Sequence, residues 1–487
     1  MTYKEIFKVT TLFGTVQGLN LVLNIIRTKI VAILIGPAGV GLNGIYNETR
    51  ELLHSTTNLG LDISGVRGIS LAYEKIQNKG KDTDSTSYNT LYSELDNQVQ
   101  LLRSWVLLLA LFGAMLCMVC ASPLSYFTFG DYEHTWGYVI LSPAVAFSTI
   151  TCGELAVLKG LRQLKSLAIV SVINVLLGLL VSVPIYFIWG ISGVLPALVI
   201  LFGAVMLCTM FFSYRTHKPS FVFTKNTLRG GRSMLRIGTV FVISGMLGHL
   251  VELFIQSYLN KEVSTDMVGL YNAGCTLTAS CIGLVFAAMD QDYFPRLTGV
   301  ITDKFERANT VRSQQEVTMM IATPLLVTFT VVIPFIVPLL LSAEFTPIIP
   351  MAQAASIGLL FRTIYLSHAY LSLAAGDKWT DFIINCIGAV DLLVVIAGYW
   401  YGGLAGMGMA LTAQHGLDLT LVYFVSRIKY GVKLGWITII NTLCHLSILI
   451  ATYVLCTILE GWRYWLAGGV MIIASILYAY SIYRKGR

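Results

Sequence analysis

Apolar runs long enough to cross a membrane follow one another along almost the whole chain. A transmembrane α-helix needs about 20 predominantly apolar residues to span a hydrocarbon core of about 30 Å. Such runs occur in fourteen segments, at 11–36, 40–72, 103–128, 136–160, 165–189, 192–214, 235–258, 266–295, 316–341, 347–374, 380–400, 404–426, 436–458 and 463–483. We therefore predict an all-α polytopic membrane protein with fourteen transmembrane helices. Because the first run is itself a span, we expect no cleaved signal peptide.

Composition and charge agree with this class. Only 12% of the 487 residues are charged and the mean hydropathy is +0.72, whereas about 25% of residues are charged in soluble domains. Basic residues gather in alternate connections between the spans, which is typical of the cytoplasmic side of membrane proteins. These connections contain Lys75, Lys79, Lys81, Lys159, Arg162, Lys165, Arg215, Lys218, Lys225, Arg229, Arg232, Arg236, Lys304, Arg307, Arg312, Lys378, Arg427, Lys429 and Lys433. Both termini are basic as well, so we predict that both are cytoplasmic and that the net charge of +7 reflects topology, without nucleic acid as a partner.

The connections give little support to an enzyme. Those expected outside the cytoplasm are no longer than about ten residues, and no Gly-rich phosphate loop occurs. The nine cysteines form no ligand pattern, and Cys117 and Cys120, despite their CxxC spacing, lie in an apolar run. Thiols in such surroundings behave as small apolar residues. We predict no catalytic residue, no metal site and no disulfide framework.

A weak duplication divides the chain. Gly14–Val16 and Val40–Leu42 open the first two spans, and Gly238–Val240 and Val268–Leu270 open the seventh and eighth. GISGVLPAL at 190–198 similarly matches GLAGMGMAL at 403–411. An offset of six spans gives both copies the same orientation, as in parallel repeats related by an axis along the membrane normal. We predict two six-helix lobes in a parallel pseudo-twofold repeat, 1–218 and 219–430, an additional helix pair at 431–487, and a transporter that rocks around a central cavity.

Polar residues at helical spacing follow one face of each of the first two spans. Such faces cannot meet lipid, because a charge at mid-bilayer costs at least about 2.5–3.5 kcal/mol. At about 1.5 Å per residue, Arg27 and Arg50 lie at similar depth, about 13 and 15 Å below the ends of their spans. Paired guanidinium groups suit a pyrophosphate; the alternative is internal ion pairs with Glu48, Glu51 and Glu154. The two faces consist of Gln17, Asn20, Asn24 and Arg27, and of Asn43, Asn47, Arg50, His54 and Asn58.

Acidic residues in the second half raise the question of ion coupling. Buried carboxylates can carry a proton or Na⁺ through a transport cycle. The alternative is that these groups form hydrogen bonds between helices. The candidates for coupling are Glu252, Asp290, Asp391 and Asp418. No other cofactor is expected.

Several stretches resemble a known family. RTKIVAILIGPAGVGL at 27–42 and LGLDISGVRGIS at 59–70 resemble the first two spans of Wzx-type O-antigen flippases, which translocate lipid-linked oligosaccharides. VGLYNAG at 268–274 and FPRLTGV at 294–300 resemble the eighth span across their superfamily, the multidrug/oligosaccharidyl-lipid/polysaccharide (MOP) exporters. The resemblance implies export of an undecaprenyl-pyrophosphate-linked glycan across the bacterial inner membrane. Fourteen spans depart from the twelve often found in Wzx-type members, and are the number in lipid II flippases.

We therefore predict an alternating-access flippase for a lipid-linked oligosaccharide. Arg27, Arg50 and Lys29 would hold the pyrophosphate, and the polar residues beside them would contact the sugars: Gln17, Asn20, Asn24, Asn43, Asn47, His54 and Asn58. The expected partners are the glycan lipid, membrane lipid and other glycan-assembly proteins, with the flippase itself a monomer. The alternatives are a lipid II flippase, a cation-coupled multidrug exporter with an acidic N-terminal cavity, and, less favoured, a scaffold or membrane enzyme.

Overall fold

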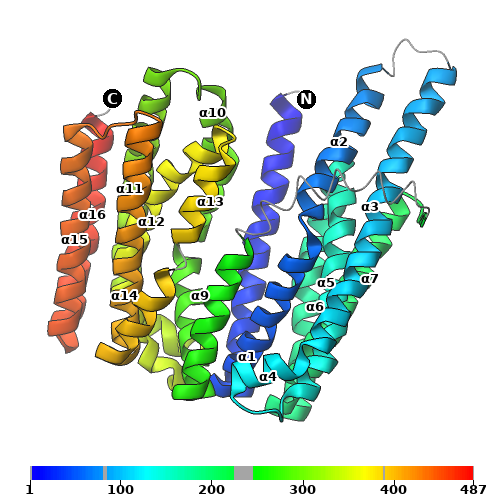
Figure 1. The fold of residues 1–487 in the computed structure, drawn as a ribbon. Coiled ribbons are helices and arrows are strands. Elements are labelled where there is room, and N and C mark those ends of the chain that lie inside the picture. The colour runs from blue at the N-terminus through cyan, green and yellow to red at the C-terminus, as the bar shows by residue number, and fades with distance from the viewer. Residues whose placement is uncertain (1–2, 80–84, 224–244, 388–389, 486–487) are drawn as a thin grey trace. The chain divides into compact units, whose positions relative to one another are not determined.

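A computed structural model describes residues 3–79, 85–223, 245–387 and 390–485, and all its regular elements are helices (Figure 1). Some side chains within these ranges, including Gln17, Asp290 and Asp391, are not described. The Gly238–Val240 copy of the repeat lies outside the described residues, as do Lys81, Lys225, Arg229, Arg232 and Arg236. The predicted all-α class is confirmed for the part of the chain that is described.

The helices follow the apolar runs in order. In the first half they are α1 (Tyr3–Asn58), α2 (Leu61–Lys79), α3 (Ser85–Val119), α4 (Ala121–Phe129), α5 (Thr135–Gly160), α6 (Leu164–Trp189) and α7 (Val194–Thr216), followed by helical residues 245–262. In the second half they are α9 (Thr265–Ala288), α10 (Phe294–Gly299), α11 (Lys304–Leu340), α12 (Ile349–Ala374), α13 (Lys378–Ile387), α14 (Asp391–Lys429), α15 (Trp436–Ile458) and α16 (Gly461–Lys485).

Among the described residues, nine helices are long and apolar enough to cross a membrane. Three of these contain a break, at Gly36, at Gly190–Gly193 and at Gly402–Gly403. Counting both parts of each, and adding 245–262 and α9, gives fourteen segments that match the predicted runs in order. By length and composition, the described structure is therefore that of a multi-pass membrane protein.

Glycine allows the sharp reversals inside α1 and α14. Gly36 has φ 59° and precedes Pro37. After this break the chain reverses direction, and α2, which follows α1, lies beside α3 (Figure 1). Gly403 has φ 56° in α14. The two parts of α14 on either side of this break are in close backbone contact. A Cβ atom added at Gly398 would lie only 2.6 Å from the carbonyl oxygen of Gly406. These left-handed conformations are accessible to glycine at little cost, so two spans can follow each other almost without a loop.

Two predicted spans are each divided in the structure. The second apolar run was expected to continue as one helix over 40–72, but it ends at Asn58, because Leu59 (φ 49°) and Gly60 (φ 68°) interrupt it before α2 begins. The run 103–128 is similarly divided between α3 and α4.

The structure divides into two compact units, Met1–Gly269 and Leu270–Arg487. In the first unit, α2, α3 and α5 enclose a core that includes Leu61, Leu102 and Val157. In the second unit, α15 and α16 pack against the preceding helices, and the hydroxyl group of Tyr464 on α16 donates a hydrogen bond to the carbonyl oxygen of Val331 on α11, 2.7 Å away. The division into lobes 1–218 and 219–430 with a pair at 431–487 stays a prediction.

Candidate substrate-binding face and charged cluster of the first unit

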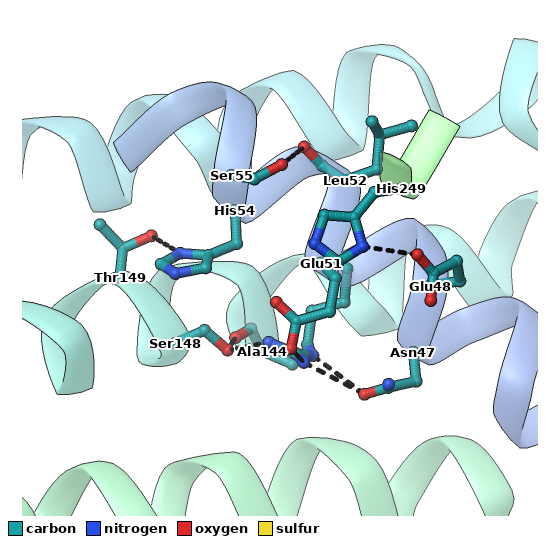
Figure 2. Close-up of polar contacts among 11 residues, drawn as sticks. Asn47, Glu48, Glu51, Leu52, His54, Ser55, Ala144, Ser148, Thr149 and His249 are labelled. Atoms are coloured by element: carbon teal, nitrogen blue, oxygen red, sulfur yellow. Dashed lines mark hydrogen bonds and ion pairs between the residues drawn. The ribbon is translucent and has the colours of Figure 1, made fainter. Parts of the chain in front are cut away.

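The polar face predicted for the second span lies against α5. Arg50, His54 and Asn58 are successive members of the face, and they contact Ser148, Thr149 and Cys152 of α5, respectively. The His54 Nδ1 and Thr149 Oγ1 atoms are 3.1 Å apart (Figure 2), and Asn58 Nδ2 lies 3.8 Å from Cys152 Sγ. The helical spacing read from the sequence therefore describes a real common face, and protein groups contact much of it.

Arg50 is buried, with 4% of its surface exposed. Its Nη1 donates to Ser148 Oγ at 2.6 Å, and its Nη2 donates to Asn47 Oδ1 at 3.1 Å and forms an ion pair with Glu51. The guanidinium carbon also lies 3.9 Å from the ring centroid of Phe202 on α7. This is the internal ion pair that the sequence analysis gave as the alternative. A role of Arg50 in binding substrate stays a prediction.

The polar face of the first span lies against α6. Asn20 Nδ2 donates to Ser171 Oγ at 2.8 Å. Arg27 is half-buried, and a Cβ added at Gly178 of α6 would lie 3.0 Å from its Nη1. No described residue forms a hydrogen bond or ion pair with the Arg27 guanidinium. The two arginines thus differ, because described protein acceptors occupy the Arg50 donors, whereas none of the described residues accepts a hydrogen bond from Arg27.

The other predicted binding residues have varied surroundings. Lys29 and Asn43 are half-buried and Asn24 is exposed, whereas the Gln17 side chain lies outside the described part. Arg27 lies against Gly178 of α6 and Arg50 against Ser148 of α5, and their convergence on one pyrophosphate is also a prediction.

The three glutamates of the ion-pair alternative have three different partners. Glu51 pairs with Arg50, and Glu48 contacts His249, whose Nδ1 lies 2.6 Å from Glu48 Oε1 (Figure 2). Glu154 on α5 pairs with Arg103 on α3, a residue that the sequence analysis did not single out. An available signal was the presence of Arg103 and Glu154 in otherwise apolar runs, since opposite charges in such positions usually pair.

The structure describes the side chains of two of the four candidate coupling carboxylates. Glu252 accepts a hydrogen bond from Gln256 at 3.1 Å. In the second unit, Asp418 Oδ2 lies 3.9 Å from His415 Nδ1. The side chains of Asp290 and Asp391 are outside the description. Coupling at any of these four positions stays a prediction.

Solved structures with a similar arrangement of helices show which fold this is. The lipid II flippase MurJ, in an inward closed conformation, superposes with a TM-score of 0.68 at 14% identity, covering 98% of this chain and 99% of that chain. An inward-facing multidrug resistance MATE family transporter of the MOP superfamily gives a TM-score of 0.63 at 14% identity, covering 85% of this chain and 94% of that chain. The fold is therefore the one found in transporters of the MOP superfamily.

Sequence comparison is more specific. The lipid III flippase of Escherichia coli (strain K12) is 25% identical over 427 residues, which cover 84% of this chain and 93% of that protein. The sequence profile of the family described as "Polysaccharide biosynthesis protein" matches residues 81–350, more than half of the chain. The chain belongs to this polysaccharide biosynthesis protein family.

Proposed function

We propose that this protein is a flippase that moves an undecaprenyl-pyrophosphate-linked oligosaccharide, an O-antigen unit or a related surface glycan, across the bacterial inner membrane. It works by alternating access, with the sugar-pyrophosphate passing along the polar face of α1 while the polyprenyl tail stays in lipid. Membership of the polysaccharide biosynthesis family, the MOP-type fold and the similarity to a lipid III flippase support this proposal.

The Arg27 guanidinium is the observation that favours a pyrophosphate most strongly. It lies half-buried within a membrane-length helix, and its donors have no described acceptor. A permanent charge in that position is costly unless water or a ligand solvates it. A planar fork of N–H donors fits phosphate oxygens in a bidentate manner. Arg27 is therefore the first contact that we assign to the head group, with Arg50 and Lys29 beside it.

Arg27→Ala tests this assignment in proteoliposomes loaded with a fluorescent undecaprenyl-pyrophosphate oligosaccharide. Translocation is followed by the accessibility of the glycan to a membrane-impermeant oxidant. Loss of a charge-assisted contact worth about 1.5–3 kcal/mol corresponds to a decrease of roughly 10- to 100-fold at subsaturating substrate. Arg27→Lys should recover only part of the activity, because an ammonium retains charge but lacks the fork.

The matched control is Arg67→Ala, which removes an exposed arginine from α2 of the same unit. Both variants should melt near wild type in detergent. Normal transport by a well-folded Arg27→Ala protein would contradict the assignment. Arg50→Ala is expected to lower both the melting temperature and transport, because Glu51 loses its counter-charge. Adding Glu51→Gln should restore the melting temperature but leave transport low.

The same vesicles distinguish the substrates. An O-antigen-type lipid should cross faster than lipid II or lipid III analogues under identical conditions. Export of a cationic dye with no glycan flipping would favour the multidrug alternative. An active protein that prefers lipid II or lipid III would correct the glycan while leaving the flippase proposal in place.

A further inference from the structure

A histidine–glutamate contact joins two distant segments of the first unit. His249 belongs to helical residues 245–262 and Glu48 to α1, and the Nδ1 and Oε1 atoms are 2.6 Å apart (Figure 2). The His249 side chain is 36% exposed and that of Glu48 is 15% exposed. Both side chains are thus partly accessible at the surface of the protein and are not sealed inside its core.

The net charge of the cluster around the pair depends on whether His249 is protonated. Arg50 and Glu51 neutralise each other through their ion pair. Glu48 is then balanced only if His249 is protonated. With that proton the cluster of Glu48, Arg50, Glu51 and His249 is neutral, and without it the cluster has a net charge of −1 inside a membrane-spanning unit. Leaving one carboxylate of a buried pair uncompensated is strongly unfavourable.

Among the described residues, Glu48 and His249 form no ion pair except the one with each other. On α1, His54 is engaged with Thr149, and α5 presents hydroxyl groups to this region, those of Ser148 and Thr149. On the helix that contains His249, Glu252 lies three residues further on and accepts a hydrogen bond from Gln256. The balance between Glu48 and His249 is therefore set mainly by the proton between them.

We propose that Glu48 and His249 together bind one exchangeable proton, and that its loss weakens the link between α1 and helical residues 245–262. Resting on the proposed flippase function, we assign this proton as the coupling ion of the transport cycle. Imidazole is the side chain whose charge changes most readily between about pH 5 and 8. The proton leaves His249 for water, and the Glu48 carboxylate then attracts that helix less strongly.

A proton fits the site better than a metal cation. A bound metal needs several donor atoms that converge on one point. Within the described residues there is no group of three or more His, Cys, Asp and Glu side chains that could hold a metal ion. Glu48 and Glu51 are instead engaged separately, one by His249 and the other by Arg50.

Infrared difference spectroscopy of the purified protein between pH 5 and 8 tests proton binding without transport. The wild-type spectrum should contain an imidazolium component, in addition to those of the other histidines, that is lost in His249→Gln and displaced along the pH axis in Glu48→Gln. Glu74→Gln, which changes an exposed glutamate 3.7 Å from Arg162, is the control and should leave the band unchanged. Superimposable spectra of wild type and His249→Gln at every pH would overturn the proposal.

Transport under imposed gradients tests the coupling. In proteoliposomes, a pH gradient should accelerate flipping by wild type and by Glu74→Gln, and this acceleration should be lost in both Glu48→Gln and His249→Gln. Acceleration that persists in both variants, or that follows a Na⁺ gradient alone, would overturn the assignment of the coupling ion. If wild type flips no lipid-linked glycan under any condition, the proposed function fails, whereas the infrared titration still decides whether the proton site exists.

Discussion

Two buried arginines of the first unit differ in how completely protein acceptors surround them. Arg103 donates from Nε and Nη2 to both carboxylate oxygens of Glu154, at 2.9–3.2 Å, and from Nη2 to Ser213 Oγ at 3.1 Å. Its Nη1 reaches the carbonyl oxygens of residues 217–218 at the end of α7. Arg50 instead pairs with a glutamate whose side chain is 35% exposed. Arg103 is therefore a structural residue that joins three helices.

Arg103→Ala should destabilise the protein severely. Removal of one partner leaves Glu154 buried without its counter-charge, at a cost of about 3–5 kcal/mol. The expected result is a much lower melting temperature in detergent, with weak expression. The double variant Arg103→Leu with Glu154→Leu removes both charges and should recover most of the loss. A single variant that melts like wild type would show that water or another group solvates Glu154.

The polar residues themselves were predictable, whereas their partners were not. Helical spacing placed Arg50, His54 and Asn58 on one face because the periodicity of a helix is fixed by its backbone. Whether Glu154 or a ligand faces Arg50, or its neighbour Glu51 pairs with it, depends on side-chain rotamers and on how neighbouring helices rotate against one another. That rotation depends on the packing of many apolar side chains, which periodicity within one segment does not specify.

Among the connections between helices, the one between α12 and α13 is held by a single carboxylate. Asp377 accepts hydrogen bonds from Thr380 Oγ1 at 2.8 Å and from the hydroxyl group of Tyr430 at 3.0 Å, and it forms an ion pair with Lys429. Lys429 above all, followed by the hydrogen-bond donors, holds the pKa of the Asp377 carboxyl well below its usual range. The residue thus fastens this connection to the end of α14.

Asp377→Asn should lower stability by about 1 kcal/mol at neutral pH, the scale of one net hydrogen bond with a weak exposed ion pair. Because the folded state has the lower pKa, the contribution is fully present above about pH 4 and is lost as the pH falls further. Melting curves should therefore show a constant difference between wild type and variant from pH 5 to 8, narrowing near pH 4. Asp292→Asn, in an exposed pair with Arg296, is the control and should change little. A difference that grows on acidification would contradict this account.

Helix ends were predicted well at Gly36–Pro37 and Gly402–Gly403 and missed at Leu59–Gly60. Gly36–Pro37 and Gly402–Gly403 interrupt apolar runs at the predicted positions, because glycine adopts positive φ readily. Leu59 also has positive φ, yet a leucine gives no sequence signal for that conformation. Tertiary packing around α2 outweighs local preference there, and the predicted helix over 40–72 therefore divides.

For the whole molecule, the distribution of basic residues predicts the orientation of the chain. Reporters fused after Lys79 and at the C-terminus should both give cytoplasmic signals, and one inserted within 130–134 should give a periplasmic signal. The fourteen-span count requires both termini on one side. A periplasmic signal at the C-terminus would remove one span and leave the role of α15 and α16 to be reassigned. The reporter position at Lys225 lies outside the described residues and is useful as a third, independent point.

The reversal at Gly36–Pro37 also bears on how the chain enters the membrane during synthesis. Each charged residue near the centre of a span opposes insertion by about 2.5–3.5 kcal/mol, so Glu48, Arg50 and Glu51 together oppose it by roughly 8–10 kcal/mol. Residues 37–58 are therefore poor substrates for the translocon by themselves. With no loop before them, they follow the apolar first part of α1 directly and enter with it as a helical hairpin, with Arg50 neutralised by Glu51. This charged, membrane-length segment thus depends for its insertion on the helix synthesised immediately before it.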